Sequence, residues 1–414
     1  MNFENFNLSS HLLIAIKKAG ITEPTQIQEL SIPHILNGKD VFGESATGSG
    51  KTLAFGSGIV ESVLPNKGIQ ALVLTPTREL AEQVKNALVK FSVKNRLNIV
   101  AVYGGISINP QISELRRAEV LVATPGRLLD HMNRRTVDLS RVGILVLDEA
   151  DRMLDMGFID DVEKIMSRCP KKRQTLFFSA TLPPPVRQLA RRHMDNPVMV
   201  SAVNMVDPAK LKQEYFNIKK NMKMALLIHL LENEKSELAM VFCNTRRNTD
   251  FVVKNLKANN VKAVAIHGGL TQNKRASTMS VFHDEKVRVL VCTDVAARGL
   301  HIENVSHIYN YELPKDPKDY IHRIGRTARA GEEGKVINLL CDLDFEAFGR
   351  IQGDYRSMKV AEMKTPLLKK VQITESRKSF GRNFSRGGNR GQGGGGRRQS
   401  GPRSRGPPRR EHRR

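Results

Sequence analysis

Short apolar runs alternate with longer segments of mixed polarity along most of the chain, and the runs are predicted strands. They fall at residues 70–76, 99–103, 120–124, 144–147 and 175–178, and again at residues 239–243, 263–267, 287–292, 307–311 and 336–341. Strands that alternate with helical segments are typical of parallel sheets. Ten strands in one twisted sheet would be unusual, and a polar stretch containing Pro208 separates the two series. The pattern therefore predicts two α/β domains.

The amino-terminal segment carries apolar residues spaced as on one face of a helix. This spacing predicts a short helix within residues 3–19, with Ser9 or Ser10 as its cap. Gln28 follows, about twenty residues before a glycine-rich loop. Its side-chain amide offers one donor and one acceptor, which match N6 and N7 of adenine. Alone, however, an exposed glutamine carries no functional signal.

Composition narrows the class of protein. The chain has 414 residues, of which 40% are hydrophobic, enough for two or three domains with sizeable cores. Its apolar runs are far shorter than the roughly 20 residues of a membrane span, and its first residues do not read as a secretory signal. Four cysteines, at positions 169, 243, 292 and 341, lack metal-ligand spacing, and the last three lie in apolar runs. We expect core cysteines and a cytoplasmic protein without a membrane anchor.

The net charge of +24 is unevenly distributed. Residues 377–414 hold thirteen Lys or Arg residues against a single Glu, which is about half of the excess. Apolar periodicity fades from about residue 364, and arginine–glycine sequence follows, which cannot bury enough apolar surface to fold. The chain lacks a basic amphipathic helix, so nucleic acid is favoured over a membrane as its partner. We expect a disordered RNA tether, with an inert solubilising tail as the alternative.

A candidate phosphate-binding loop spans residues 45–52. Its glycines allow backbone N–H groups to approach phosphates, Lys51 supplies positive charge, and Thr52 offers a hydroxyl to Mg²⁺. Ser45 departs from the strict pattern, which has Gly or Ala at that position. A chance Gly/Ser loop would rarely end in Gly-Lys-Thr at the start of a helix. Besides Lys51 and Thr52, the nucleotide-binding residues expected here are Thr47, Gly48, Ser49 and Gly50.

The predicted strand at residues 144–147 ends in three carboxylates, Asp148, Glu149 and Asp151. Open α/β sheets bind their ligands at the carboxyl ends of their strands. Three such charges repel one another unless a cation, a role as a base or a basic partner occupies them. An acidic loop capping the next helix is the alternative. Together with the phosphate loop, the carboxylates predict an ATP site in which Asp148 holds Mg²⁺ through water and Glu149 orients or deprotonates the attacking water.

Other predicted strands are followed by small polar residues and arginines. Such segments begin at Pro76, Gly104, Thr124 and Ser179 in the first half, and at Phe242, Thr293 and His322 in the second. Any one of them is explained by helix capping or a tight turn. Seven at strand ends are harder to explain in that way, and they predict a functional edge on each sheet.

With Asp148-Glu149-Ala150-Asp151 and these segments in this order, the chain resembles the DEAD-box RNA helicases of superfamily 2. The resemblance runs from Phe3 to about residue 345 and covers a dozen motifs. It implies two tandem RecA-like domains, each a parallel sheet flanked by helices, with ATP in the cleft and RNA across both domains. On this pattern we expect domain 1 at residues 1–204, a linker at 205–210, domain 2 at 211–362 and the basic tail at 363–414.

The resemblance also implies roles for individual residues. In nucleotide binding it implicates Phe3, Thr25 and Gln28 at adenine, Lys51 and Thr52 at phosphates and Mg²⁺, Asp148 and Glu149 at metal and water, Gly299 and His301 at the ribose, and Arg326 and Arg329 as arginine fingers. In coupling between ATP and RNA it implicates Asp151, Ser179, Thr181 and His322. In the RNA path it implicates Arg78, Gly105, Thr124, Arg127, Asn244, Arg275 and Thr293. Arginine suits the finger role because its planar fork stays charged.

Three positions depart from the family pattern. Ile21 stands where an aromatic residue usually stacks on adenine, and Ala328 replaces a glycine between the last arginines. His301 replaces the aspartate whose carboxylate accepts hydrogen bonds from the ribose. Because neutral hydrogen bonds are weaker than charged ones, we predict a weaker preference for ATP over dATP than in the family.

The expected function is RNA-stimulated ATP hydrolysis, with ATP and Mg²⁺, coupled to local, non-processive unwinding of short RNA duplexes or remodelling of RNA–protein complexes. Aromatic residues are 5% of the chain and Trp is absent, which favours recognition of the RNA backbone over base stacking. An ATP-gated RNA clamp that scaffolds partners, an RNA-annealing chaperone and, least favoured, a DNA helicase are the alternatives. The architecture resembles bacterial-type members, for which we expect a monomeric core and partners in ribosome assembly or RNA decay.

Overall fold

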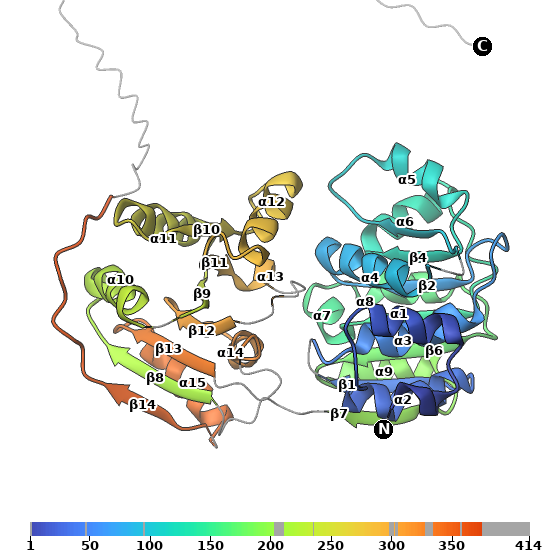
Figure 1. The fold of residues 1–414 in the computed structure, drawn as a ribbon, viewed down its shortest axis with the longest axis horizontal. Helices are drawn as coiled ribbons and strands as arrows, with labels where there is room; N and C mark the ends of the chain where they lie inside the picture. The colour runs from blue at the N-terminus through green and yellow to red at the C-terminus, as the bar shows by residue number, and fades with distance from the viewer. Residues whose placement is uncertain are drawn as a thin grey trace, which may run out of the picture. The chain divides into compact units, whose positions relative to one another are not determined.

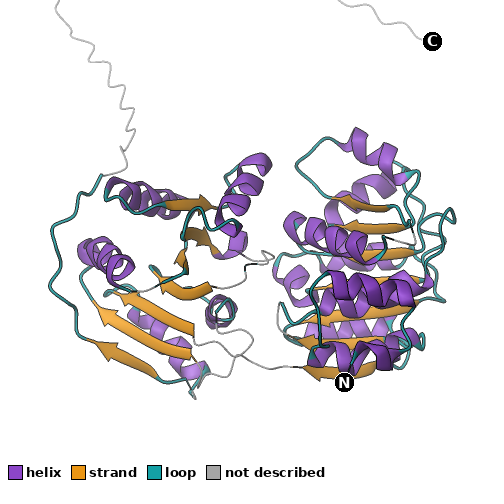
Figure 2. Cartoon of the chain, viewed as in Figure 1, coloured by secondary structure: helices purple, strands orange, loops and turns teal. Residues whose placement is uncertain are grey.

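The computed structural model describes residues 2–45, 48–93, 96–202, 211–234, 236–297, 302, 305–327, 334–356 and 358–374. They contain two seven-stranded sheets whose paired strands are all parallel and which are flanked by helices (Figures 1 and 2). The prediction of two parallel α/β domains is confirmed. The expected linker and the tail from residue 375 lie outside the described residues, as do Thr47, Gly299, His301 and Arg329.

The first sheet has the strand order β3-β4-β2-β5-β6-β1-β7. Its strands are β1 (Val41–Ser45), β2 (Ala71–Leu74), β3 (Ile99–Val102), β4 (Val120–Ala123), β5 (Ile144–Asp148), β6 (Gln174–Ser179) and β7 (Val198–Ala202). Its helices are η1 (Phe3–Phe6), α1 (Ser10–Lys18), α2 (Gln26–Leu36), α3 (Lys51–Ser62), α4 (Arg78–Phe91), α5 (Ile108–Leu115), α6 (Pro125–Asn133), α7 (Ala150–Asp155), α8 (Ile159–Met166) and α9 (Pro184–His193).

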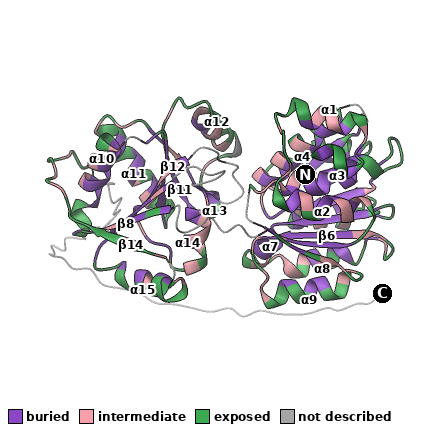
Figure 3. Ribbon diagram, turned by 60° about the horizontal axis from the view of Figure 1, so that its bottom comes forward, coloured by how far each residue is buried: buried purple, intermediate pink, exposed green. Residues whose placement is uncertain are grey.

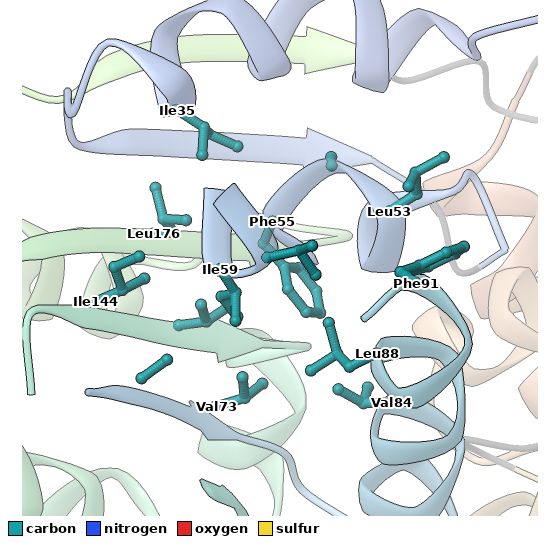
Figure 4. Close-up of a cluster of buried hydrophobic side chains, with 14 of the residues drawn as sticks. Ile35, Leu53, Phe55, Ile59, Val73, Val84, Leu88, Phe91, Ile144 and Leu176 are labelled. Carbon is teal, nitrogen blue, oxygen red and sulfur yellow. The ribbon is translucent and has the colours of Figure 1, made fainter. Parts of the chain in front are cut away.

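Along the strands of the first sheet, successive apolar side chains point to opposite faces and contribute to two hydrophobic cores, one on each face. On β5, Val146 faces the core built with α1 to α4, whereas Leu145 and Leu147 face the core built with α6 to α9. Figure 3 shows buried residues along both the strands and the inner sides of the helices. In Figure 4, Phe55 and Ile59 of α3 lie among side chains from α4 and the strands. This packing fixes the helix that begins at the phosphate loop.

The second sheet has the order β10-β11-β9-β12-β13-β8-β14. Its strands are β8 (Leu211–Asn217), β9 (Leu238–Cys243), β10 (Ala263–Ile266), β11 (Val289–Thr293), β12 (Val305–Asn310), β13 (Gly334–Leu340) and β14 (Val360–Met363). Its helices are η3 (Lys220–Met222), α10 (Lys223–Asn233), α11 (Arg246–Ala258), α12 (Gln272–His283), α13 (Asp294–Ala297), α14 (Pro317–Ile324) and α15 (Phe345–Asp354). The two sheets share the same pattern of crossovers, as two copies of one fold do.

The ordered chain continues past the boundary expected at residue 362. Edge strand β14 pairs with β8, and residues 364–374 then follow the second domain to the end of α11 (Figure 1). Leu368 and Val371 pack against its core. Residues 364–374 form neither helix nor strand, so periodicity does not reveal this segment.

The four cysteines are buried and free, which confirms the three predicted core positions and adds Cys169. In the part of the chain that the structure describes, no helix combines the length and apolar character needed to cross a membrane.

Candidate nucleotide and nucleic-acid sites

The phosphate loop joins β1 to α3. Gly48 and Gly50 have φ angles of +80° and +91°, a left-handed conformation that favours glycine, and Gly50 caps α3. The first turn of α3 therefore begins at the loop, and the N-terminus of a helix suits an anion. Lys51 is 5% exposed, and its Nζ donates to the carbonyl of Ser45 at 3.1 Å. The lysine thus lies within the loop rather than pointing into solvent.

Ser45, the departure from the strict loop pattern, has a local partner. The hydroxyl of Ser49 donates to the hydroxyl of Ser45 at 3.0 Å, across the mouth of the loop. Ser45 itself is fully buried at the end of β1. The substitution therefore adds a hydrogen bond that holds the loop, where Gly or Ala would offer none.

Gln28 lies against this loop. Its Oε1 accepts from the backbone N–H of Thr25 at 2.9 Å, as part of a capping box, and its Nε2 donates to the carbonyl of Gly50 at 3.0 Å. The hydroxyl of Thr25 donates to the carbonyl of Ser49 at 2.7 Å. One amide hydrogen and one lone pair of Gln28 are left by these bonds, enough to pair with an adenine. The structure thus brings Thr25 and Gln28 to the nucleotide loop.

Phe3 and Ile21 take part in the core beneath this element. Phe3 is 3% exposed and meets Phe6 edge-on, with ring centroids 6.0 Å apart. Ile21 is partly buried and packs against the same cluster. In this structure Phe3 is therefore a core residue of the first domain, in the same cluster as Ile27 of α2.

Asp148 ends β5 next to the phosphate loop. It is 2% exposed, and burial raises its pKa to about 7, against the opposing charge of Lys51. Its Oδ1 is buried and, among the residues described, has no hydrogen-bond partner. A buried, unsatisfied carboxylate oxygen is the kind of hard oxygen ligand that Mg²⁺ prefers.

The residues present fit Mg²⁺ bound chiefly by a nucleotide. Over the described ranges, His, Cys, Asp and Glu side chains do not gather in the groups of three or more that would hold a metal by themselves. Mg²⁺ commonly uses one or two protein oxygens and takes its other ligands from phosphates and water. Asp148 and Thr52 would supply the protein ligands.

Glu149 follows Asp148 in a left-handed conformation, with φ of +55°, and caps α7. This conformation turns its side chain towards Arg152, whose Nη1 donates to Oε2 at 2.6 Å. Burial acts to raise the pKa of Glu149, but the charges of Arg152 and Lys51 outweigh it and lower the pKa to about 2. The two adjacent carboxyls thus have opposite pKa shifts, set by their different neighbours.

Asp151 connects this site to the end of β6. Its Oδ2 accepts from both the backbone N–H and the hydroxyl of Thr181, each at 2.9 Å. Ser179 accepts from the backbone N–H of Asp151 at 3.1 Å and donates to the carbonyl of Thr181 at 2.7 Å. Three residues that the resemblance grouped as coupling residues therefore form one closed network.

A second group of predicted residues meets at the carboxyl ends of β2, β3 and β4. The guanidinium of Arg78 lies on Gly105, where φ is +85° and a Cβ would overlap it. Arg127 donates to the carbonyl of Ile106 at 2.9 Å, and Thr124 caps α6. The Nη1 of Arg127 is buried and lacks a hydrogen-bond partner within the described part of the chain. Backbone close to two guanidinium groups, one with an unsatisfied donor, suits phosphate contacts.

The second domain is organised around a residue that the sequence did not single out. Arg323 of α14 is 1% exposed and forms a bidentate pair with Asp294, at 2.6 and 2.7 Å. It also donates to the side chain of Asn310 at 2.8 Å, the carbonyl of Glu312 at 2.6 Å and the side chain of Asn244 at 3.0 Å. Its guanidinium lies 4.9 Å from the ring centre of Phe242.

This arginine joins the ends of β9, β11 and β12 to α14. Asn244 is tied further by its Nδ2, which donates to the carbonyl of Leu313 at 2.7 Å. Thr293 ends β11, and Arg275 lies in the first turn of α12. His322 and Arg326 lie one residue before and three residues after Arg323. One feature of the sequence could have pointed to a buried arginine here: the acidic residue Asp294 follows a predicted strand and had no assigned partner.

Comparisons with known proteins agree on one family. A model described as DEAD/DEAH box helicase matches residues 25–189, and one described as Helicase conserved C-terminal domain matches residues 222–331. The DEAD-box ATP-dependent RNA helicase CshA of Bacillus subtilis (strain 168) is 44% identical over 372 residues, 89% of this chain and 75% of that protein. The ATP-dependent RNA helicase CshA of Listeria monocytogenes is 45% identical over 341 residues, 82% and 66% of the two proteins.

Solved structures agree with the fold. A DEAD box protein from the hyperthermophile Methanococcus jannaschii is 40% identical, with a TM-score of 0.55 over 88% of this chain and 99% of that one. S. cerevisiae Dbp5 bound to RNA and ADP BeF3 is 30% identical, with a TM-score of 0.78 over 88% and 96% of the two chains. The two sheets are therefore tandem RecA-like domains.

Proposed function

Because the chain belongs to the DEAD-box ATP-dependent RNA helicases, a family of RNA-dependent ATPases, we propose that it couples ATP hydrolysis to local, non-processive opening of short RNA duplexes. The observation that carries this proposal is the network joining Asp151, Ser179 and Thr181. It links the acidic end of β5 to the end of β6, so a change at the ATP site moves the loop that follows β6. A coupled enzyme needs such a link, and a simple ATPase does not.

In the proposed reaction, Lys51 and the N–H groups of α3 bind the phosphates of ATP, and Thr25 and Gln28 read the adenine. Bound Mg²⁺, held by Thr52 and Asp148, would neutralise charge on the phosphates. Glu149 orients the attacking water or accepts its proton, and its lowered pKa favours the orienting role. Arg326 and Arg329 of the second domain complete the site when the domains close, by stabilising the charge that grows on the γ-phosphate.

The RNA contacts follow the strand ends of both domains. Arg78, Gly105, Thr124 and Arg127 would hold phosphates on the first domain, and Asn244, Arg275 and Thr293 would do so on the second. The unsatisfied Nη1 of Arg127 supports this assignment, since a buried guanidinium donor without a partner costs free energy until an anion binds. Binding through the backbone makes recognition nearly independent of sequence.

The basic residues 377–414 would act as an RNA tether. Their excess of positive charge adds counterion release, which makes RNA binding depend steeply on salt. Removing residues 377–414 should raise the RNA KM and flatten its salt dependence, with little change in kcat. A large fall in kcat would contradict a tether.

The decisive experiment measures ATP hydrolysis with and without single-stranded RNA, and then strand separation. We expect strong RNA stimulation in the natural chain and loss of hydrolysis in Glu149→Gln, with ATP binding retained. Glu163→Gln is a matched control, because Glu163 also pairs with an arginine, Arg192 at 2.9 Å, but on the surface of the same domain. A short duplex should be separated much faster than a long one. Hydrolysis indifferent to RNA, or equal rates on both duplexes, would refute the proposal.

We further propose a cytoplasmic location and partners in ribosome assembly or RNA decay. The four free cysteines are compatible with a reducing compartment, and the named relatives are bacterial helicases. Fractionation of cells and identification of RNAs crosslinked to the protein would test both statements.

A further inference from the structure

The last turn of α11 holds an extended segment of the chain by its backbone. Asn259 accepts from the N–H of Gln372 at 3.0 Å and donates to the carbonyl of the same residue at 2.8 Å. One helical turn earlier, Asn255 accepts from the N–H of Thr374 at 2.7 Å and donates to its carbonyl at 3.4 Å. Each asparagine amide therefore pairs with both polar backbone groups of one residue.

The spacing of this pair matches an extended chain. Four residues of an α-helix rise about 6 Å, and two residues of an extended chain span about 6.6 Å. The asparagines contact every second residue, and the side chains of residues 372–374 remain exposed. We call Asn255 and Asn259 the asparagine clamp. The clamp bonds to backbone groups of Gln372 and Thr374, so it does not depend on which side chains these residues carry.

The segment before the clamp is held more lightly. Thr365 donates to the carbonyl of Asn217 at 3.4 Å, and Leu368 and Val371 are only half-buried against α10 and α11. Few buried apolar contacts mean a low free energy of local opening. The buried Asn255, which also donates to the carbonyl of Phe251 at 2.9 Å, is consequently the firmest point of attachment for the whole segment.

The order of the contacts gives the direction of the chain. Residue 372 lies at Asn259 and residue 374 at Asn255, so the chain runs antiparallel to α11, towards its first residue, Arg246. That end adjoins Asn244, one of the proposed RNA contacts. Nine residues of helix separate Asn255 from Arg246, about 14 Å, which about four extended residues cover.

We propose that the asparagine clamp fixes the point and direction from which the basic carboxyl-terminal segment leaves the second domain, so that its first cations are delivered to the RNA edge. Those cations are Arg377, Lys378 and Arg382. The inference rests on the proposed RNA tether and adds its anchor. Without the clamp, the tether would begin near Met363, at the end of β14, instead of at Thr374.

In a chain with a shortened tether, the effect of the clamp on the RNA KM becomes large enough to measure. In a chain ending at residue 384, ten residues follow the clamp, and release of residues 364–374 lengthens this tether to about twenty. Effective concentration falls roughly as the −3/2 power of tether length, so the RNA KM should rise about threefold. The variant is Asn255→Ala with Asn259→Ala, and Asn259→Ala alone is a milder version should the pair affect folding. Asn233→Ala is the matched control, since the hydrogen bonds of its amide to described residues are to His229, within α10.

The same substitutions in a chain ending at residue 374 complete the test. There the clamp holds no cations, so we expect an unchanged RNA KM, and in all chains an unchanged kcat. Hydrogen exchange at the amides of residues 372 and 374 reports directly whether the clamp has opened. An equal rise of the RNA KM in both chains, or no rise in the chain ending at 384 once exchange shows release, overturns the proposal. Equal RNA KM for the unsubstituted chains ending at 374 and 384 refutes the tether itself.

Discussion

Replacing Arg323 by lysine tests whether one buried guanidinium organises the second domain. Arg323 makes five hydrogen bonds, two to Asp294 and one each to Asn310, Glu312 and Asn244. Lysine keeps the charge, so Asp294 remains paired, but it has a single nitrogen with three hydrogens. At least two of the five bonds must therefore be lost, together with the planar contact on Phe242.

The size of the effect follows from these bonds. Hydrogen bonds to charged groups each contribute about 1.5–3 kcal/mol, so the loss of two predicts a destabilisation of about 3 kcal/mol or more. Domains have free energies of unfolding of only about 5–15 kcal/mol. RNA-stimulated hydrolysis should fall too, because Arg323 holds α14, which carries His322 and is followed by Arg326, against the strand ends.

Intrinsic fluorescence can follow this domain. The chain has no Trp, and five of its six tyrosines are in the second domain, at positions 215, 309, 311, 320 and 355. Urea unfolding monitored by tyrosine emission therefore reports chiefly on that domain. Arg350→Lys is the matched control, because the ion pair of Arg350 with Glu346, at 3.9 Å, is exposed, and a change within about 0.5 kcal/mol is expected. A loss below about 1 kcal/mol in Arg323→Lys would refute the reasoning.

Three further predictions concern the first domain and the ribose position. Gly50→Ala should raise the ATP KM at least tenfold, because φ is +91° and the new Cβ would overlap the amide of Gln28, whereas Gly349→Ala, with open space around it, should not. Burial lowers the pKa of His131, near Arg127, so the unfolded chain gains a proton first, and stability falls below about pH 6.5. His131→Gln should flatten that fall in urea titrations between pH 7 and 5, and an unchanged slope would contradict it. His301→Asp should widen the ratio of dATP to ATP KM, and equal ratios would contradict it.

Much of the first domain could be predicted because its strands are apolar on both faces. The strands of residues 71–74, 120–123 and 144–148 each lie within one residue or two of the predicted limits, since a strand buried on both sides must be continuously apolar. The carboxyl ends of those strands carry the motifs, so the sheet order brings together residues far apart in sequence. Asp151 and Thr181 show this, thirty residues apart and 2.9 Å from each other.

The ten predicted strands did not include β1, β7, β8 or β14, and the last two break that rule. β8 buries Gln213 and Glu214, which a hydropathy pattern counts as surface residues. Their partners are distant in sequence: the Oε1 of Gln213 accepts from Tyr320 at 3.0 Å, and Glu214 pairs with Lys335 at 3.1 Å. β14 is mostly exposed and has no apolar run to mark it. Pairings between distant polar residues are set by the tertiary fold, and a single sequence does not display them.

Arg323 and the asparagine clamp escaped prediction for the same reason. An arginine among others in a basic segment gives no sign that it is buried, and its partners lie between 11 and 79 residues away. Asn255 and Asn259 gain their meaning only from a backbone more than a hundred residues later. Local patterns identify elements and motifs, whereas polar contacts between distant segments must come from the structure.

Coupling between ATP and RNA is the central claim, and linkage offers its most direct measurement. The dissociation constant of a short single-stranded RNA should be measured without nucleotide and with saturating ADP–beryllium fluoride, and that of the nucleotide complex without and with RNA. The account predicts tighter binding by the same factor in both directions, with typical couplings of about 5–150-fold. A factor of one in either direction would contradict a helicase cycle in which ATP and RNA close the two domains together.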